Sequence, residues 1–206
     1  MLTARSISLM GMTEPAVVRV PAREELRQVA LELFATDGYA ATSLQLIADR
    51  AGYAKSNVLY HFRSKEAVLD AAIGPAVDAI DRLVDEFVES GQSDAARGAF
   101  IGRFVDVLFE HRLAISVFVN QGLLLRDTPV IDRANEVITR LAAAVIDEQA
   151  TVAEQMRFGV ALAGAAYTLV AGQTFFQERI EDADVDEARA GLIGVVTELL
   201  QPGTER

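Results

Sequence analysis

The sequence predicts an all-α protein in two parts: an N-terminal three-helix domain containing a helix-turn-helix, and a larger helical domain after it. Apolar residues recur at the 3.6-residue spacing of helices along most of the 206 residues. Only five prolines are present and no Asn-Gly hairpin signal occurs, which argues against a β protein. The third observation is the segment from Thr42 to Glu66, TSLQLIADRAGYAKSNVLYHFRSKE. It has the spacing of two short helices joined by a glycine turn and followed by the start of another helix.

We expect residues 1–20 to form a mobile N-terminal arm, residues 21–70 the helix-turn-helix domain (the head), and residues 71–206 the larger domain (the body). Met10 or Met12 could be the true start, so the sequence leaves open whether the first 11 residues belong to the native protein. The boundary is expected within a continuous helix, because a helix can transmit a tilt from body to head that a flexible linker could not.

The first helix of the head is predicted from about Arg23 to Asp37. Its apolar face consists of Leu26, Ala30, Leu33 and Phe34. Gly38 should end it, because glycine adopts the left-handed conformation past a helix end at little cost.

The second helix is predicted to start with a capping box formed by Thr42 and Gln45. Its buried face comprises Leu44, Ile47, Ala48 and Ala51, and Gly52 should end it. The third begins at about Lys55. There Val58, Leu59 and Phe62 are expected to face inward, while the outward face carries Lys55, Ser56, Asn57, Tyr60 and His61.

The fourth helix should open at Ser64, kink at Gly74-Pro75 and continue to about Ser90. Its inward residues at the start are Val68, Leu69, Ala72 and Ile73. Further body helices are predicted over residues 94–110, 113–125, 129–148, 152–176 and 185–200.

The segment from Arg23 to Ala72 resembles the DNA-binding domain of the TetR family of bacterial transcriptional regulators. The matching residues are Ala30, Phe34, Gly38, Tyr39, Thr42, Ile47, Ala48, Ala51, Gly52, Leu59, Tyr60, Phe62, Lys65 and Glu66. Two positions depart from the family pattern. Ala54 stands where the family often has a serine cap, worth about 1 kcal/mol. Leu59 occupies the column of an aromatic residue, and Tyr60 follows it.

Two kinds of DNA contact are expected from this head. Helix amino termini at Thr42 or Ser43 and at Ser64 suit phosphates; Tyr60 and His61 can also donate to phosphates, and the resemblance implies that Lys65 does so. Base edges would be read by Lys55, Ser56 and Asn57. The alternative is that these side chains form an ordinary solvated helix face. Arg19 and Arg23 could enter a minor groove as an arm, or belong to a disordered one.

Charge and composition narrow the function classes. Residues 1–70 carry no net charge, so the whole excess of −11 lies in the body, and only the head can approach a polyanion without repulsion.

The chain has no cysteine and two histidines, and we expect no metal or other cofactor. No catalytic motif emerges, so we expect no enzyme. The sequence shows no secretory signal, which predicts a cytoplasmic protein. The uncharged run 158–177 is interpreted as a buried helix rather than a membrane span.

Small residues in the last two helices predict a homodimer, since such stripes let helices approach closely. The stripes are Ala161, Ala165, Thr168 and Gly172 in one helix, and Ala190, Gly191 and Gly194 in the other. The alternative is that both stripes pack inside one subunit.

The TetR resemblance implies a ligand pocket in the body, for which the candidate residues are Phe104, Phe118, Gln121, Arg157 and Tyr167. Each could instead belong to the core, an internal hydrogen bond or the dimer interface. The implied function is a ligand-responsive regulator, a repressor that binds a palindromic double-stranded DNA operator as a homodimer and is released by a small-molecule effector. The sequence does not identify the effector. The alternative is a helical dimeric module that binds a small molecule or a protein and does not bind DNA.

Overall fold

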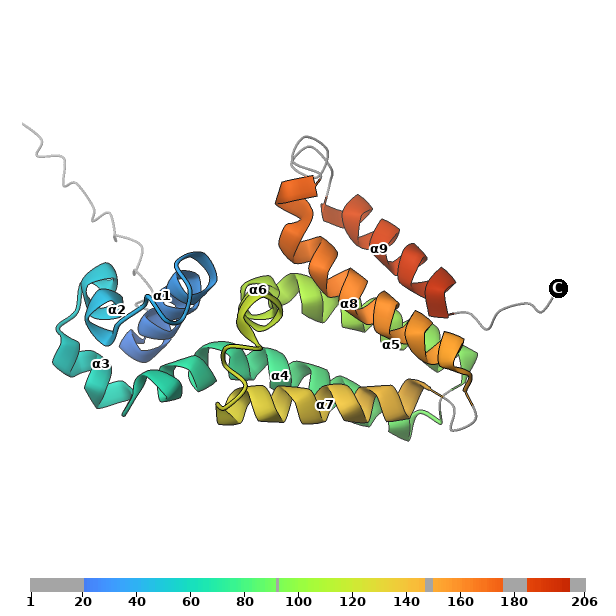
Figure 1. The fold of residues 1–206 in the computed structure, drawn as a ribbon, viewed down its shortest axis with the longest axis horizontal. Coiled ribbons are helices and arrows are strands. Elements are labelled where there is room, and N and C mark those ends of the chain that lie inside the picture. Colours follow the sequence, from blue (N-terminus) through green and yellow to red (C-terminus); the bar gives the residue numbers. More distant parts are fainter. Residues whose placement is uncertain (1–20, 92, 147–149, 176–184, 201–206) are drawn as a thin grey trace, which may run out of the picture.

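The all-α prediction is confirmed in the computed structural model, which describes residues 21–91, 93–146, 150–175 and 185–200. Within these residues every regular element is an α-helix (Figure 1). The helices are α1 (Ala22–Thr36), α2 (Leu44–Ala51), α3 (Lys55–His61), α4 (Lys65–Glu89), α5 (Asp94–Glu110), α6 (Arg112–Gln121), α7 (Pro129–Val145), α8 (Val152–Phe175) and α9 (Val185–Leu200). The predicted arm, with Arg19, lies outside the described residues.

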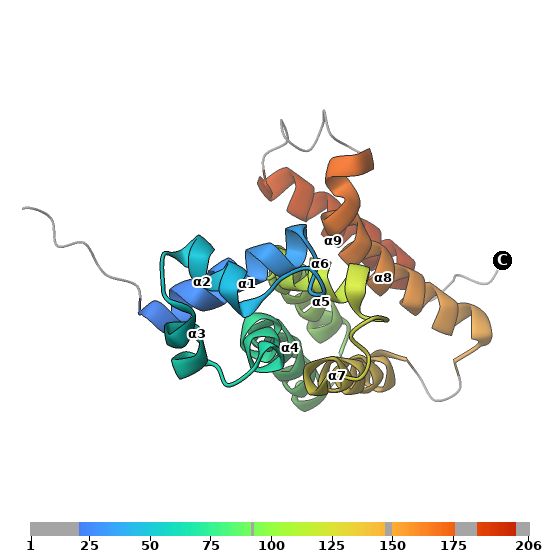
Figure 2. The same ribbon diagram turned by 60° about the vertical axis from the view of Figure 1, so that its left-hand side comes forward.

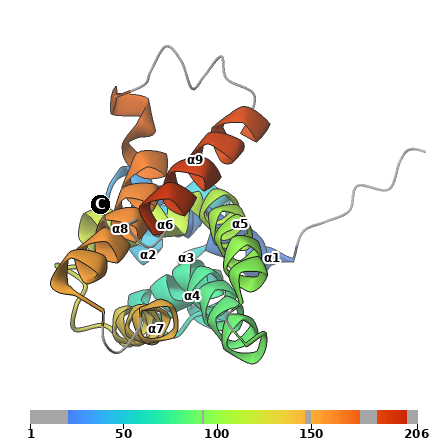
Figure 3. The ribbon, with the colours of Figure 1, turned by 90° about the vertical axis from the view of Figure 1, so that its right-hand side faces the viewer.

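The head, α1 to α3, forms one end of an elongated molecule, and α4 runs from it into the body (Figures 1 and 2). Along one side of the body α7 lies against α4, while α8 and α9 pack together on the opposite side. Between these two layers lie α5 and α6 (Figure 3). None of the described helices has the length and apolarity that crossing a bilayer requires.

Helix α1 agrees with its prediction to within one residue at each end. Its four predicted apolar residues are buried. Gly38 follows the helix with φ +87°, the left-handed conformation expected of it.

The predicted capping box of α2 is wrong. Ser43 is the N-cap residue, and its Oγ accepts the backbone N–H of Leu46 at 3.0 Å. The Thr42 hydroxyl instead donates to the carbonyl of Gly38 at 2.9 Å, and the residue is only 1% exposed. Gln45 donates to Asp49 one turn later. Gly52 ends the helix at φ +74°, as expected.

Helix α3 is attached to the head by Val58 and Phe62, which are both buried. These residues are four apart and share one helix face. Leu59 was predicted to face inward, but it is 45% exposed because it is rotated by about 100° from Val58. Ala54 provides no side-chain cap, as the sequence indicated.

Helix α4 opens at Ser64, whose Oγ accepts the N–H of Ala67 at 3.1 Å, and runs to Glu89 as predicted. It continues through Pro75 as one helix, and the kink there stays a prediction. The predicted boundary between head and body, residue 70, lies inside this helix, and the apolar core extends across that boundary. Side chains of α6 and α7, among them Val117 and Ile131, pack in the same cluster as the head. A second cluster joins the far half of α4 to α5, α8 and α9.

Two predicted helices of the body are too long at their carboxyl ends. Helix α6 ends at Gln121 rather than residue 125, because the N–H groups of Leu124 and Leu125 turn back to the Gln121 carbonyl. That turn buries Leu125 while leaving Leu124 exposed. Helix α7 ends at Val145, where Ile146 becomes extended with ψ 128°, and residues 147 and 148 lie outside the description.

Candidate nucleic-acid interface

The outer face of α3 is polar and accessible. Lys55, Ser56 and Tyr60 are exposed, the last at 84%, whereas Asn57 and His61 are partly buried. The rings of Tyr60 and His61 meet edge to face with 5.0 Å between their centroids. Because Val58 and Phe62 hold the opposite face in the core, the exposed side chains are presented by a fixed helix at the end of the molecule (Figure 2).

The guanidinium of Arg23, one of the two proposed arm residues, lies 5.2 Å from the centre of the Phe62 ring. It therefore packs against the end of α3 from the first turn of α1. Arg23 therefore belongs to α1, and the prediction that it forms part of an arm is wrong. Its side chain is nevertheless exposed beside the outer face of α3.

The two candidates at the start of α2 differ in accessibility. The Thr42 side chain is buried and its hydroxyl proton is used within the head, so it cannot reach a phosphate. Ser43 is exposed, and its hydroxyl accepts a hydrogen bond while its own proton is available for donation. Of these two side chains, Ser43 is therefore the one able to contact DNA.

The ammonium group of Lys65 already contacts other groups of the head. Its Nζ lies 4.1 Å from the centre of the Tyr39 ring and 3.5 Å from the Ala40 carbonyl oxygen. Burial lowers the pKa of this amine below its usual range. The lysine thus joins the start of α4 to the turn that follows α1, and a phosphate would have to compete with the Tyr39 ring.

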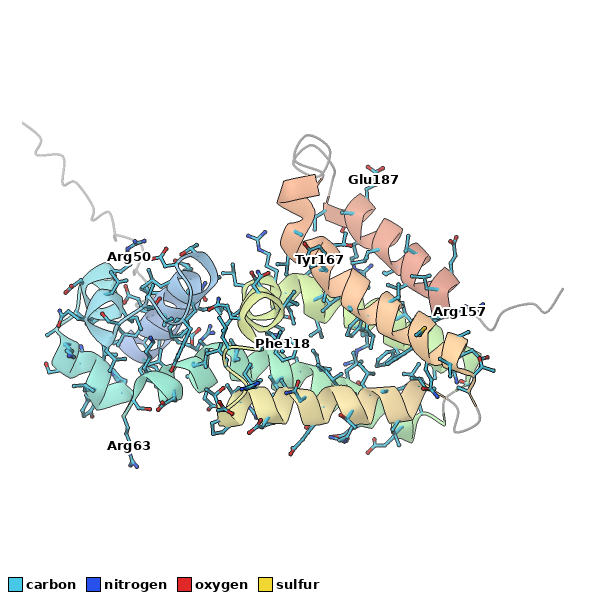
Figure 4. All side chains as sticks on the ribbon, in the orientation of Figure 1. Arg50, Arg63, Phe118, Arg157, Tyr167 and Glu187 are labelled. Atoms are coloured by element: carbon cyan, nitrogen blue, oxygen red, sulfur yellow. The ribbon has the colours of Figure 1, made fainter. Side chains whose placement is uncertain are left out.

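The sequence reasoning did not single out Arg63, which directly follows α3 and its cap residue. Its side chain is exposed and points away from the head in Figure 4, as does that of Arg50 in the last turn of α2. The signal in the sequence was a basic residue between the end of α3 and the Ser64 cap.

The five candidate pocket residues do not line one cavity, so the prediction of a single site formed by all five is wrong. Phe104 is buried and stacks on Phe100, with 6.1 Å between ring centres. Phe118 lines a small apolar cavity of about 50 Å³ between α4, α6 and α7. Arg157 lines a different cavity of about 600 Å³ at the other end of the body. Figure 4 shows Phe118, Arg157 and Tyr167 spread along the body.

Gln121, the fifth candidate, binds the head. Its side-chain oxygen accepts the backbone N–H of Tyr39 at 2.7 Å, and its side-chain nitrogen donates to the Phe34 carbonyl at 2.7 Å. Phe34 is in the last turn of α1, where carbonyls lack partners within the helix. The end of α6 therefore caps α1, and the head is attached to the body at a second place besides α4.

Arginines join the helices of the body. On α7, Arg133 pairs with Asp78 of α4 at 2.5 Å, and Arg140 pairs with Asp81 and Asp85. Arg103, another arginine, pairs across the surface with Glu86. These arginines are satisfied by carboxylates on the surface, and α4 is held to α7 along its length.

Comparison with known proteins relates the head to one family of regulators. A family model described as "Bacterial regulatory proteins, tetR family" matches residues 26–72. The HTH-type transcriptional repressor KstR2 of Mycolicibacterium smegmatis is 29% identical over 113 residues, which are 53% of this chain and 54% of the relative. Residues 26–72, which include the helix-turn-helix, are thus similar to the DNA-binding domain of the TetR family. The regulator RutR of Escherichia coli is 27% identical over 137 residues, 66% of this chain and 63% of the relative.

Solved TetR-like structures share the fold. The ketosteroid transcriptional regulator KstR2 of Mycobacterium tuberculosis aligns with a TM-score of 0.70 and 16% identity, over 88% of this chain and 95% of that one. A TetR-family regulator from Bordetella parapertussis gives 0.68 and 21%, over 89% and 96%. At these identities the likeness establishes the fold alone. In sequence, the chain spans about half the length of the KstR2 relatives that it matches.

The predicted small-residue stripe on α8 is wrong at two of its four positions. Ala161 and Ala165 are buried within the subunit, because this face of α8 packs against the rest of the body, whereas Thr168 is partly exposed. The side-chain environment of Gly172 lies outside the description. The outward face of α8 instead carries Met156, Val160 and Tyr167, which are exposed and recur at helical spacing. Beside it on α9, the predicted stripe of Ala190, Gly191 and Gly194 is exposed, and so is Val195.

Proposed function

We propose that this chain is a ligand-responsive transcriptional regulator that binds a double-stranded DNA operator as a homodimer. The observation that carries the proposal is the outer face of α3. Val58 and Phe62 fix the helix in the head core, while Lys55, Ser56 and Tyr60 are exposed for a major groove. A short helix presented in this way is the element that reads DNA in a helix-turn-helix.

Different side chains of the head would take different roles. Lys55 and Asn57 would donate to base edges, lysine to guanine and asparagine to adenine, and Ser56 would assist them. Ser43, Tyr60, His61 and Arg63 surround them and would bind phosphates, with Lys65 contributing once it leaves the Tyr39 ring. The phosphate contacts orient the protein, and the base contacts select the site.

The short length of α3 is the reason for proposing a homodimer. One seven-residue helix contacts too few base pairs to select an operator, whereas two heads read two half-sites about one turn apart. The exposed apolar side chains of α8 and α9 supply the surface for a two-fold interface. Water would be excluded from Met156, Val160 and Val195 when two subunits meet.

Repression is the mode of control that the relatives support, because the matched KstR2 proteins are named transcriptional repressors, while RutR is named a regulator. An effector that binds the body would release the operator through the two attachments of the head. These are the continuous helix α4 and the hydrogen bonds of Gln121. A coupling of about 1–3 kcal/mol between the two sites is enough for release.

The test begins with selection of bound sequences from a random DNA pool, followed by gel retardation on the recovered site. We expect a two-fold symmetric site, and affinity that falls steeply with salt through counterion release. The double variant Lys55→Ala/Tyr60→Ala should lose retardation and keep its helical circular dichroism. Arg82→Ala, an exposed arginine of the body, is the control and should bind normally.

Two outcomes would contradict the proposal. Sequence-selective binding by the double variant would show that α3 is not the reading helix. Failure of the wild-type chain to enrich any site would favour the alternative, a helical dimer that binds a small molecule or a protein without DNA.

A further inference from the structure

The cavity of about 600 Å³ lies at the end of the body away from the head. Figure 3 looks onto this end, where α4, α7 and α9 finish and α5 and α8 begin. Its walls are mainly apolar and include Phe87, Phe100, Ile101 and Phe158. A volume of this size is typical of sites for small organic ligands, and burying apolar surface there would drive binding.

The polar groups of the cavity are dominated by two arginines. Arg97 is partly buried and donates one long hydrogen bond, 3.4 Å, to the Val145 carbonyl. Arg157 is exposed, and within the described residues its guanidinium forms no hydrogen bond or ion pair. Each guanidinium has five N–H donors, so most of these donors are available to a ligand.

Among the described lining residues the carboxylate is that of Glu154, and it already accepts hydrogen bonds from Thr151. Glu154 accepts the backbone N–H of Thr151 at 2.7 Å and its hydroxyl at 2.8 Å, at the start of α8. These bonds hold the carboxylate at the helix terminus, where the helix dipole also favours it. Among the described residues that line it, the cavity therefore combines an apolar wall with more cationic donors than these contacts use.

We propose that this cavity is the effector site of the proposed regulator and that it binds a small amphiphile with one carboxylate. The apolar part of the ligand lies among Phe87, Phe100 and Phe158, and the carboxylate is bound by Arg97 and Arg157. Guanidinium and carboxylate match in geometry and form charge-assisted pairs. The body as a whole is acidic, but its distant charges are screened over about 8 Å at physiological salt, so the two arginines determine the local preference.

The position of Phe87 explains how such a ligand could act on the head. Phe87 is in the last turn of α4, and Lys65, at the first position of the same helix, lies beside the turn between α1 and α2. A helix of 25 residues is about 37 Å long, so α4 connects the cavity directly to the head. An occupant that displaces Phe87 therefore tilts the element to which the head is attached.

The first test measures binding without DNA, so that it stands apart from the operator assay. Decanoate and its uncharged counterpart decanamide are titrated into the full chain by calorimetry, with 2-naphthoate as an aromatic carboxylate. We expect both carboxylates to bind more tightly than decanamide. In the variant Arg97→Met/Arg157→Met the affinity for decanoate should fall by about ten- to a hundredfold, and decanamide should be unaffected.

A second variant locates the ligand. Gly98 lines the cavity, and a side chain added there meets no atom within 4 Å at its Cβ, so Gly98→Leu should fill the space without disturbing α5. Gly102→Leu, one turn along the same helix, is the matched control, since its added Cβ also meets nothing and Gly102 does not line the cavity. Both should keep their thermal stability, and only Gly98→Leu should lose decanoate.

The proposal is overturned if neither carboxylate binds, if decanamide binds as tightly as decanoate, or if Gly98→Leu binds normally. On the recovered operator, saturating decanoate should weaken retardation of the wild type but not of Gly98→Leu. Binding to the cavity without this effect would overturn its role as effector site. If no operator is recovered, the proposed function fails while the calorimetric result still stands.

Discussion

Gln121 and Tyr39 are 82 positions apart in the chain, yet the backbone N–H of Tyr39 donates to the side-chain oxygen of Gln121 at 2.7 Å. The same side chain donates to Phe34, so one amide satisfies both sides of the turn that ends α1. Gly38 lies between these two partners, and a Cβ there would be 3.5 Å from the Gln121 oxygen. The body thus holds the head by a specific polar contact as well as by the shared core.

Replacement Gln121→Met should therefore loosen the head. It keeps the length of the side chain but leaves the Tyr39 N–H and the Phe34 carbonyl without their partner, at a cost of about 1–3 kcal/mol in unfolding free energy. Urea denaturation measures this cost, and amide hydrogen exchange should show faster exchange at Tyr39. Asn120→Ala is the control, since Asn120 is exposed and donates to Ser116 one turn earlier. Unchanged protection of the Tyr39 amide would contradict the assigned contact.

The uncapped start of α3 predicts a stabilising substitution. Ala54 is exposed, with φ −76° and ψ 148°, the extended conformation of an N-cap residue. Ala54→Ser should accept a backbone N–H in the first turn and raise the unfolding free energy by about 1 kcal/mol. Ser56→Ala, at an exposed position within α3, serves as a comparison and should change little. A serine at position 54 that left the urea midpoint unchanged would contradict this.

Acid should weaken the attachment of α9. Arg189 of α9 forms a hydrogen-bonded ion pair with Asp106 of α5, which lowers the pKa of that carboxyl below its ordinary value of about 3.9. Because the folded pKa is the lower one, the stabilisation is present above the ordinary value and is lost as pH falls through the folded pKa. Since the pair is at the surface, the effect should be small.

Thermal melts from neutral pH to below about pH 4 measure this dependence. Asp106→Asn should melt lower than wild type at neutral pH, and the difference should shrink in acid. Glu110→Gln changes a nearby exposed carboxyl on α5 and should not reproduce this pattern. A constant difference between Asp106→Asn and wild type at every pH would show that the ion pair does not contribute.

The proposed dimer predicts an oligomeric change. Val160 lies in the middle of the exposed apolar face of α8, and Val160→Glu would place a charge where water must be excluded. Sedimentation velocity should show dimers for the wild type and monomers for the variant at the same concentration. Thr139→Glu, on the exposed side of α7, should remain dimeric. Dimers of Val160→Glu would indicate that another surface forms the interface.

Much of the fold could be predicted because it depends on local patterns. The bounds of α5 and α9 agree with the prediction at both ends, and α1 agrees within a residue, since spacing and terminal residues act within a few positions. The predictions that failed have one cause in common, which is contact between helices that the local pattern does not contain. Ser43 replaced Thr42 as the cap because the Thr42 hydroxyl is bound by the Gly38 carbonyl, and that contact depends on how α1 and α2 meet.

The helical class, the order of the helices and the segment with the TetR pattern were all predictable without a structure, because periodicity and capping are properties of neighbouring residues. Which surfaces those helices present depends on how the helices pack. The packing placed Gln121 against the head rather than in a pocket, turned Ala161 inward and Val160 outward, and brought Arg97 and Arg157 to one cavity. Each of these depends on contacts between helices distant in sequence, where packing selects one face from several that periodicity leaves equivalent.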